Sequence, residues 1–335
     1  MTKGKALVHF DKSAGGLISA GDPISTGCLT SVGGPISAGA AIGLGNFDGL
    51  HLGHMSLIHS LTKIAKSKRV AALLYTFYEH PHNVLNNTRN VRLLTDCIQK
   101  CRIVEKTGVD SILFDRFDIA FSKMTPEEFV RDVLVKKLAA KYVVSGYNYR
   151  FGRNGAGTSE TLKALSAEYG LKAFVIEPYT VNGVAASSSL IRGFVEAGDM
   201  KAASHLLGRL FSLRGEVVKG RQIGRKMGLP TANFAPDGNM AIPKPGAYVS
   251  SVKLQDGSIR RGVTSIGTNP TVGLLNSFVA ETHIFDFHEV IYGQEIEVFL
   301  HRKIRDELKF RRIEELKSRI QEDILETKGF FTGLL

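Results

Sequence analysis

The sequence is short of cysteine and contains no long apolar run. Its three cysteines, Cys28, Cys97 and Cys101, cannot all pair, and Cys97 and Cys101 lack the C-x-x-C spacing of redox or zinc motifs. No uninterrupted apolar stretch reaches the roughly 18 residues that cross a bilayer, and the opening MTKGKALVHFDKS holds too short an apolar stretch for a secretory signal. These absences predict a protein of the reducing cytoplasm without a membrane partner.

The charge balance is strongly basic. A net charge of +11 and a pI near 9.5 suit nucleic acid, an anionic membrane surface or phosphorylated small molecules, and the sign alone does not choose among them. The densest basic run, 302–312, also holds Asp306 and Glu307, which is typical of a solvated face. A length of 335 residues predicts two domains.

The segment 13–40 is rich in Gly, Ser, Ala and Pro and has little apolar periodicity to bury. It lacks both G-x-x-x-x-G-K-[ST] and G-x-G-x-x-G, so a phosphate-cradling role is not favoured. Residues 1–40 are therefore predicted to be a flexible N-terminal segment, a mobile loop or an irregular hairpin, which is either a lid over a site or an inert insertion.

Short apolar runs and amphipathic segments alternate from Ala41 to about residue 195. Helices are expected to begin near Asp96, Pro126 and Ser159, and another carries Leu57, Ile58, Leu61, Ile64 and Ala65 on one face. The expected strands are AAIGL, VAALLYTF, SILF at 111–114, KYVVSG at 141–146 and KAFVIEPY at 172–179. This alternation predicts an α/β fold with a doubly wound parallel sheet over residues 41–195.

The helical alternation stops near Gly208, after an expected linker at 196–208. Five expected strands are joined by Gly and Pro turns: SLRGEVVKG, GAYVSSVKL, SIRRGVTSIG, SFVAETHIFDF and EIEVFLHRKI. A closing helix is expected from the helical spacing of Ile313, Leu316, Ile320 and Ile324. Residues 209–335 are therefore predicted to form an antiparallel β-barrel with a terminal helix.

The most informative segment is GLGNFDGLHLGH at 43–54, which follows an expected strand and opens an expected helix. Parallel sheets bind nucleotides at such a turn. Gly45 and Gly49 allow the backbone to approach a ligand, while His51 and His54 stand three apart at the helix start and can face one anion. A triphosphate bound there would have its charge neutralised as pyrophosphate leaves.

The H-x-G-H string is a signature of the nucleotidyltransferase superfamily, which includes class I aminoacyl-tRNA synthetases and small-molecule adenylyltransferases. The sequence has no K-M-S-K-S-like loop of the synthetases. A second expected helix start offers three hydroxyls, of Ser187, Ser188 and Ser189, and the fixed charge of Arg192. These donors can grip β- and γ-phosphates.

With these motifs the chain resembles the prokaryotic bifunctional riboflavin kinase/FAD synthetase family, from about Ala41 to near the C-terminus. The segments that carry the resemblance are GNFDGLHLGH, TFYEHP at 76–81, GYNYRFG at 146–152 and SSSLIR at 187–192. The resemblance implies that His51 and His54 are catalytic contacts to the ATP phosphates. It also implies that the ATP site includes Gly45, Asn46, Phe47, Asp48, Gly49, Ser187, Ser188, Ser189 and Arg192.

Three positions depart from the family pattern. Glu79 replaces the usual first proline of the second motif, Asn148 stands where Asp is common, and Ser189 stands where Thr is common. Asn148 and Arg150 are expected to bind flavin or to lie near the metal, and loss of the aspartate charge would weaken Mg²⁺ affinity if residue 148 touches the metal. Tyr147, Tyr149 and Phe151 fit either flavin contact or ordinary packing.

The β-rich half holds GRQIGRKMGLPTANF at 220–234, in which oxygen-bearing side chains two apart can ligate one Mg²⁺. Read alone, P-T-A-N is equally a turn. The family resemblance continues through SIGTNPTV at 265–272, ETHIFDF at 281–287, IYG at 291–293 and RDELKF at 305–310. It implies an ATP site of Gly220, Arg221, Arg225, Thr231 and Asn233, with Thr231 and Asn233 also binding Mg²⁺.

The resemblance further implies that Glu281 is the base that accepts the proton of the riboflavin 5′-hydroxyl. Arg305 either touches the flavin or pairs with Asp306 or Glu307, and His283 and Asp286 are expected to be structural. The predicted function is phosphorylation of riboflavin to FMN and adenylylation of FMN to FAD with MgATP. A basic tRNA- or nucleic-acid-acting protein is the alternative, the oligomeric state is left open, and no nucleic-acid partner is expected.

Overall fold

The computed structural model describes residues 8–11, 16–19, 39–87, 91–220, 224, 228–268, 278–310 and 312–333. The chain divides into two compact units, Met1–Ala186 and Ser187–Leu335, and each is described by itself. In the described part of the chain, no helix is both long and apolar enough to span a membrane.

The first unit is built on a seven-stranded sheet in the order β2-β1-β5-β4-β3-β6-β7. The last five in that order run parallel to one another. They are β5 (Ser111–Asp115), β4 (Ala71–Phe77), β3 (Ala40–Leu44), β6 (Ala140–Gly146) and β7 (Lys172–Ile176). Among the five parallel strands, the chain passes first through the central β3, then outward to β4 and β5, and returns to β6 on the other side of β3, so the predicted doubly wound sheet is confirmed.

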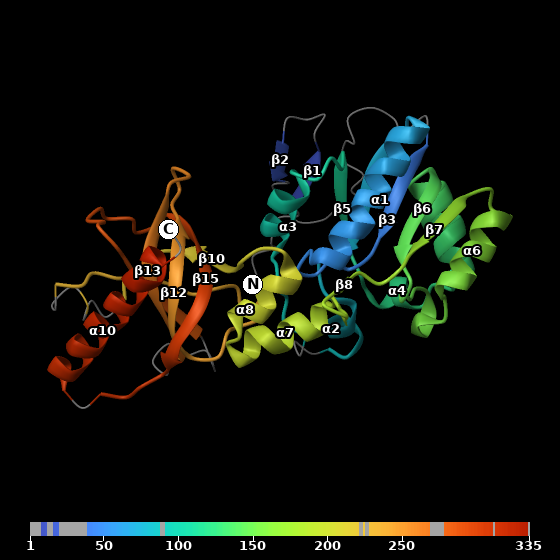
Figure 1. Ribbon diagram of the computed structural model, residues 1–335. Coiled ribbons are helices and arrows are strands. Elements are labelled where there is room, and N and C mark those ends of the chain that lie inside the picture. Colours follow the sequence, from blue (N-terminus) through green and yellow to red (C-terminus); the bar gives the residue numbers. More distant parts are fainter. Residues whose placement is uncertain are drawn as a thin grey trace. The chain divides into compact units, whose positions relative to one another are not determined.

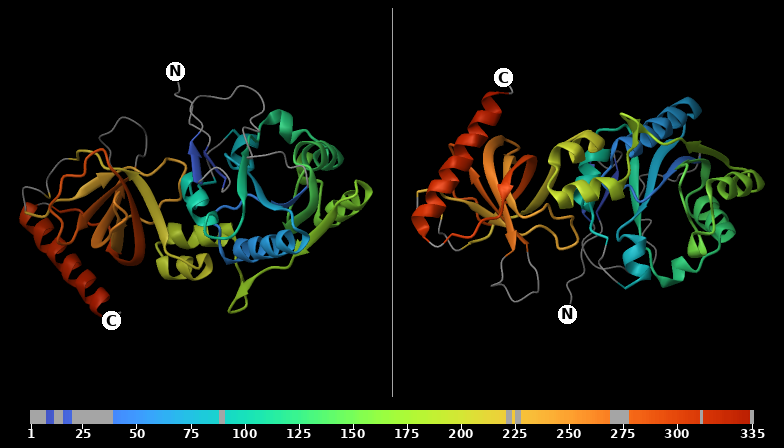
Figure 2. Two further views of the ribbon diagram at one scale, coloured as in Figure 1. Left: turned by 90° about the horizontal axis from the view of Figure 1, so that it is seen from above. Right: turned by 60° about the horizontal axis from the view of Figure 1, so that its bottom comes forward.

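Helices cover both faces of this sheet (Figures 1 and 2). One face packs against α1 (Leu52–Lys68) and α3 (Cys97–Val104), around Leu57, Leu61 and Cys101. The other packs against the π-helix η1 (Phe129–Lys137) and α6 (Ser159–Glu168), around Phe129 and Leu162. Shorter helices are α2 (Pro81–Leu85), α4 (Ile119–Ser122), α5 (Pro126–Glu128) and η2 (Arg153–Gly155).

The predicted helix starts are confirmed by their caps. Asp96 caps α3 in a capping box with Gln99, and Thr125 caps α5 in another with Glu128. Thr158 caps α6. In each case the side chain satisfies a backbone N–H that the first helical turn leaves without a partner.

Two hairpins complete the first unit. Strands β1 (Val8–Asp11) and β2 (Gly16–Ser19) pair antiparallel, and β1 continues the sheet on the edge of β5. The rest of the predicted flexible segment up to residue 38, including Cys28, lies outside the described residues. Strands β8 (Thr180–Val181) and β9 (Val184–Ala185) are joined by Asn182 and Gly183, both at positive φ, as a tight hairpin requires.

The second unit begins with two helices and continues as an antiparallel sheet. Helices α7 (Ser188–Ala197) and α8 (Met200–Leu207) occupy most of the stretch 196–208 expected as a linker. The six strands follow in the order β10-β15-β12-β13-β14-β11. They are β10 (Phe211–Glu216), β15 (Glu295–Asp306), β12 (Gly246–Lys253), β13 (Ile259–Thr268), β14 (Phe278–Ile284) and β11 (Ala232–Phe234).

The two edges of this sheet meet through one bridge. Beyond the end of β10, the Val218 N–H donates to the Asn233 carbonyl of β11 at 2.8 Å. The sheet therefore curls round on itself, which confirms the predicted barrel and leaves few strand edges to pair with another chain.

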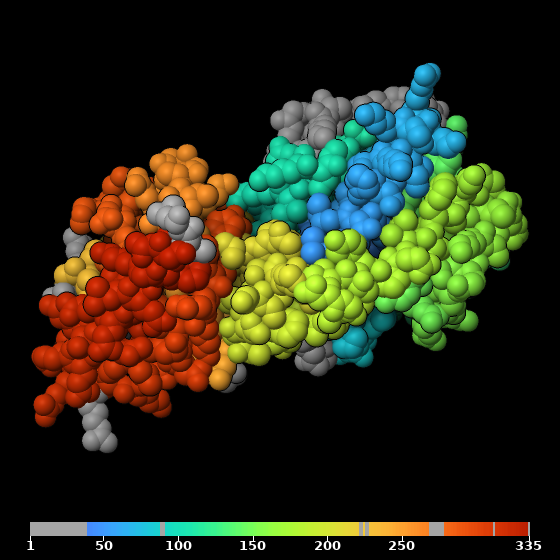
Figure 3. Space-filling view, viewed as in Figure 1, coloured from blue at the N-terminus to red at the C-terminus, as the bar shows by residue number. Residues whose placement is uncertain are grey.

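Helix α10 (Ile313–Thr332) lies along the outside of the barrel strands (Figure 1), and its residues form part of the surface seen in Figure 3. The helix is confirmed, but its most buried positions are Asp323, Thr327 and Phe331, while Ile313 is 60% exposed. A buried ion pair lies on this face, in which the Arg305 guanidinium of β15 binds the Asp323 carboxylate at 2.7 Å. Leu316, Ile320 and Ile324 are partly buried on the same side, so the predicted stripe faces the barrel except at Ile313.

Candidate functional site

The turn between β3 and α1 lies at the carboxyl edge of the central strand, where the sheet order switches sides. Phe47, Gly49 and Leu50 all have positive φ, at 46°, 78° and 42°. For the two non-glycine residues this conformation costs roughly 1 to 3 kcal/mol each. Both side chains are fully buried, which contributes about 1.5 to 3 kcal/mol apiece and offsets the strain.

Asp48 ties this turn to the segment before α3. Its carboxylate accepts the Leu94 N–H at 2.8 Å and the Thr95 N–H at 3.4 Å, while the Gly49 N–H donates to the Thr95 hydroxyl at 3.1 Å. The Asp48 side chain is only 2% exposed. A buried carboxylate that accepts backbone N–H groups is strongly held, so the turn has little freedom to relax.

His51 and His54 open α1. His51 is the N-cap residue, and its Nδ1 accepts the His54 backbone N–H at 3.3 Å. A nitrogen that accepts cannot carry the ring proton, so the neutral His51 ring is protonated on Nε2. The two rings stack with centroids 3.7 Å apart and planes at 21°. Two imidazoles beside the backbone N–H groups of a helix start form a concentrated set of donors for one anion.

Gly53 makes room for the His51 ring. A Cβ at this position would lie 3.0 Å from His51 Cε1 and 3.1 Å from His51 Nδ1. Gly45 is similar, because its Cβ would meet the Phe47 ring at 3.3 Å. The middle glycine of H-L-G-H therefore serves the placement of the first histidine.

Two side chains from other elements of the first unit hold the backbone of this turn. The Asn46 carbonyl accepts the Thr76 hydroxyl and the Lys100 ammonium, each at 3.0 Å. Thr76 belongs to TFYEHP at the end of β4, and Lys100 comes from α3. This network joins the first two family motifs and adds a buried lysine.

The GYNYRFG segment lies at the carboxyl end of β6, the strand beside β3. Asn148 and Arg150 are exposed, as is Tyr147. Tyr149 stacks on Phe151 with centroids 5.8 Å apart, and burial raises the pKa of the Tyr149 hydroxyl. Phe151 belongs to the core around Phe129. Packing accounts for Phe151, while the exposed polar residues stand at the edge where ligands bind parallel sheets.

The three serines open α7, the first helix of the second unit. The Ser187 hydroxyl caps the helix by accepting the Leu190 N–H at 3.3 Å. Ser188 and Ser189 occupy its first turn, and Arg192 is half-buried one turn further on. Hydroxyls, backbone N–H groups and a guanidinium at one helix start suit phosphate oxygens.

The second set of predicted site residues gathers on β11 and β14. Asn233 pairs directly with Glu281 across the two strands, and the exposed Glu281 stands on their outer side. The Asn233 amide donates to the Thr231 hydroxyl at 3.2 Å. A Cβ on Gly220 would lie 2.6 Å from Asn233 Oδ1, so this glycine leaves the space that the amide occupies.

His283 anchors the same segment, because its Nδ1 lies 2.9 Å from the Pro230 carbonyl oxygen. Arg221 and Arg225 lie outside the described residues. The Arg305 guanidinium binds both Asp323 oxygens through Nε and Nη2 at 2.7 to 3.1 Å, and its Nη1 donates to the Asp306 carbonyl at 3.0 Å. Arg305 thus fastens α10 to β15, and its flavin contact stays a prediction.

Known proteins match both halves of the chain. The family models for FAD synthetase and for riboflavin kinase match residues 35–190 and 207–331. The bifunctional riboflavin kinase/FMN adenylyltransferase of Buchnera aphidicola subsp. Schizaphis graminum is 34% identical over 87% of this chain and 94% of its own. The protein of that name from Listeria monocytogenes is 35% identical over 88% of this chain and 93% of its own. The chain belongs to the bifunctional riboflavin kinase/FMN adenylyltransferase family.

Among solved structures, a protein described as a macrolide-efflux protein from Streptococcus pneumoniae matches with a TM-score of 0.78 and 30% sequence identity. The match covers 87% of this chain and 94% of that one. Membership of the family explains why the two motif sets occur in one chain, and it does not favour the nucleic-acid alternative.

Mg²⁺ prefers a small number of hard oxygen ligands from protein, completed by phosphate and water. Thr231 and Asn233 fit this preference by residue type, because they carry a hydroxyl and an amide oxygen, and Asn233 stands opposite Glu281 in the strand register. Within the described residues, no cluster of three or more His, Cys, Asp or Glu could hold a metal by itself. The donor set therefore suits a metal that arrives with ATP.

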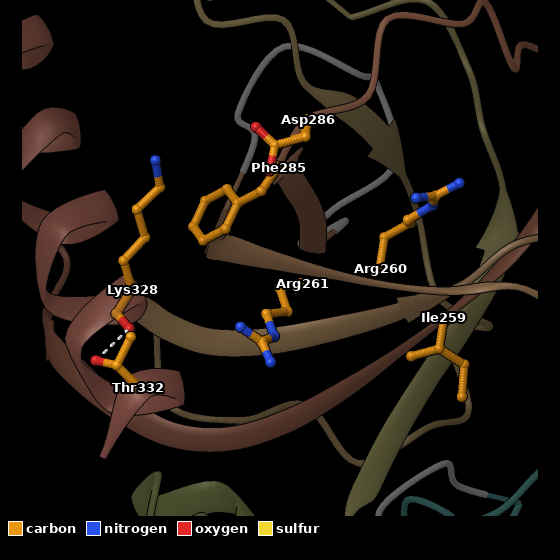
Figure 4. A pocket seen from close by; sticks show the side chains of 7 residues that line it. All are labelled: Ile259, Arg260, Arg261, Phe285, Asp286, Lys328 and Thr332. Atoms are coloured by element: carbon orange, nitrogen blue, oxygen red, sulfur yellow. Dashed lines mark hydrogen bonds between the residues drawn. The ribbon is translucent and has the colours of Figure 1, made fainter. Parts of the chain in front are cut away.

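A separate hollow of about 440 Å³ lies between the start of β13, the end of β14 and α10 (Figure 4). Its lining contains none of the predicted site residues, and comprises Ile259, Arg260, Arg261, Phe285, Asp286, Lys328 and Thr332. Lys328 lies over the Phe285 ring at 5.6 Å, and Arg261 lies over Phe331 at 5.0 Å. These cation–π contacts serve to pack α10 on the barrel.

Sequence reasoning did not single out Gly53, Thr76, Thr95 or Lys100 as site residues. Gly53 stands inside GNFDGLHLGH and Thr76 inside TFYEHP, where the histidines and the aspartate are the residues with evident chemistry. Thr95 and Lys100 belong to LTDCIQK, where a Thr-Asp helix start and a lysine look like ordinary cap and surface residues. Only the fold brings that segment under the turn after β3.

Proposed function

We propose that the chain phosphorylates riboflavin to FMN in its barrel and transfers AMP from ATP to FMN in its parallel-sheet domain. The observation that carries the proposal is that both families match one chain, each over the half that holds its motifs. The proposed domains are 41–195 for adenylyl transfer and 209–335 for the kinase, joined through 196–208. Cytoplasmic location and the lack of a nucleic-acid partner are part of the same proposal.

In the kinase step, Glu281 accepts the proton of the riboflavin 5′-hydroxyl while that oxygen attacks the γ-phosphorus of ATP. One P–O bond forms to the ribityl oxygen and the bond to ADP breaks. Thr231 and Asn233 hold Mg²⁺, which neutralises phosphate charge when bound. Support comes from the strand register, in which Asn233 and Glu281 stand directly opposite each other on β11 and β14.

In the adenylyl-transfer step, an FMN phosphate oxygen attacks the α-phosphorus of a second ATP and pyrophosphate leaves. The Nε2–H of His51 and the His54 ring stabilise the charge that develops on the leaving oxygens. Ser187, Ser188, Ser189 and Arg192 bind the pyrophosphate end, and Asn148 and Arg150 face the flavin. The His51 cap supports this role, because it directs the ring proton to the nitrogen away from the helix backbone.

Product analysis of the full chain with riboflavin, ATP and Mg²⁺ tests the proposal. Wild type should form FAD, His51→Ala should stop at FMN, and Glu281→Ala should form FAD only when FMN is supplied. His59→Ala, an exposed histidine of the same helix, and Glu289→Ala, an exposed glutamate beyond β14, are the matched controls. Absence of both FMN and FAD from the wild-type reaction would refute the proposal.

A further inference from the structure

Lys100 is a buried lysine without an acidic partner. The residue is 3% exposed, and its ammonium donates to the Asn46 carbonyl at 3.0 Å. Among the described residues, no carboxylate lies within ion-pair distance of it. Taking a lysine out of water is costly unless an opposite charge compensates it, and a single carbonyl is a weak substitute. Such a cation is retained where its charge or its donor is used.

The Asn46 carbonyl that Lys100 holds belongs to the turn between β3 and α1. The Thr76 hydroxyl donates to the same oxygen at 3.0 Å. Thr76 and Lys100 together therefore occupy both lone pairs of the Asn46 carbonyl oxygen. All peptide bonds of the described residues are trans. In a trans peptide the C=O and the following N–H point in opposite directions.

The Phe47 N–H therefore points away from Lys100 and Thr76. It has no hydrogen-bond partner among the described residues. Phe47 also has a φ of 46°, a conformation that a non-glycine residue holds only when its surroundings impose it. Lys100 and Thr76 are the two side chains that fix this peptide.

We infer that Lys100 is a positioning residue for adenylyl transfer. It fixes the Asn46–Phe47 peptide from the protein interior so that the turn presents its N–H groups to the nucleotide phosphates, and the phosphates supply negative charge to a lysine that forms no ion pair with a described carboxylate. This role rests on the proposed adenylyltransferase activity of the first unit. It requires a donor and a positive charge at residue 100, and not merely a side chain that fills the space.

The test is steady-state kinetics of FMN to FAD on the full chain, with the riboflavin kinase step of the same preparation as an internal control for folding. Lys100→Met should lower kcat/KM for ATP by about tenfold to a hundredfold, the loss that slight misplacement produces. Its thermal midpoint should equal or exceed that of wild type, because an apolar chain replaces a buried ion. Lys100→Arg should recover most of the lost rate.

Thr76 provides a second, smaller perturbation of the same carbonyl. Thr76→Val should lower FAD formation several-fold, whereas Thr76→Ser, which keeps the hydroxyl, should leave it within about twofold of wild type. A double-mutant cycle between Lys100→Met and Thr76→Val should show coupling, since both act on one peptide.

Two results would overturn the role of Lys100. One is a Lys100→Met protein that forms FAD at a wild-type rate. The other is a variant that loses both activities together with its thermal midpoint, which a purely structural residue would give. If wild type itself formed no FAD from FMN, the proposed activity would fail separately. The inference would then be decided by the rise in thermal midpoint on adding MgATP: a smaller rise for Lys100→Met than for wild type would support it, and an equal rise would overturn it.

Discussion

The turn after β3 and the P-T-A-N segment on β11 hold their predicted ATP-binding residues in opposite ways. In the turn, positive-φ residues are fixed by buried polar contacts from Asp48 and Lys100. On β11, ordinary extended backbone carries Asn233 opposite the exposed Glu281. The first site depends on backbone shape and the second on side chains displayed from a strand. Substitutions in the turn should therefore lower activity by moving backbone and ring positions. Substitutions on β11 and β14 should lower it by removing a reactive or ligating side-chain group.

The largest expected effect is on the side-chain site. Glu281→Gln keeps the shape of the carboxyl group but removes the base, so riboflavin phosphorylation should fall roughly 10³-fold. Adenylylation of added FMN should not change, which a coupled flavin assay would measure. Glu289→Gln is the control. A Glu281→Gln enzyme with normal kinase activity would show that the kinase site does not depend on the Glu281 carboxylate as a base.

The next effect is on the stability of the barrel unit. Asp323→Asn leaves the buried Arg305 guanidinium without its counter-charge, and the free energy of unfolding should fall by about 3 kcal/mol. Glu326→Gln removes the exposed pair with Arg302 and should change it by less than about 1 kcal/mol. Urea denaturation followed by far-UV circular dichroism measures both. Equal values for the two variants would show that Asp323 is not effectively buried.

Geometry at the first site is tested by a single methyl group. Gly53→Ala places a Cβ about 3.0 Å from the His51 ring, so the ring must move and FAD formation from FMN should fall roughly tenfold. Riboflavin phosphorylation should be unaffected. Gly329→Ala, in an open helical position of α10, should leave both rates unchanged and stabilise its helix by up to about 1 kcal/mol. A Gly53→Ala enzyme as active as wild type would show that the position of the ring does not matter.

The smallest effect is a pH dependence in the barrel unit. Burial lowers the pKa of His301, which packs against Phe330 and Phe331 and lies 3.0 Å from the Ser251 hydroxyl. The unfolded chain then binds more protons than the folded one, so stability is complete above the ordinary histidine pKa and declines as the pH falls through it. His301→Gln should flatten the change in unfolding free energy between pH 7.5 and 5.5. An unaltered slope would assign that dependence to other groups.

Much of the architecture could be predicted from local pattern. The strands AAIGL and KYVVSG and the caps at Asp96 and Thr158 are local signals, and the structure forms them where the sequence indicates. The apolar spacing indicated the inward face of α10, since Leu316, Ile320 and Ile324 are partly buried. The ion pair on that face could not be predicted, because the partner of Asp323 lies on a strand that ends before the helix begins. A buried charge is decided by a contact distant in sequence, and hydrophobic periodicity carries no information about it.

In the candidate sites too, residues in local motifs could be predicted, whereas residues that depend on contacts distant in sequence could not. His51, His54 and Glu281 could be named because each stands in a contiguous motif. Lys100 could not, since it reaches Asn46 across 54 positions of sequence and is buried only after α3 packs on the sheet. Motifs identify what touches a ligand, whereas the residues that support the motif depend on tertiary structure.

The bridge between Val218 and Asn233 closes the barrel at its seam, the line where the two edge strands of the sheet meet. This seam contains Asn233, one of the proposed kinase-site residues. Strand β11 is three residues long, so the seam has few hydrogen bonds and is the natural place for local opening. Because a residue proposed to bind Mg²⁺ and ATP sits on that seam, ligand binding and seam closure are thermodynamically linked. The Val218 amide should therefore exchange with solvent faster than amides of β12 and β13, and slow selectively when MgATP binds the kinase site.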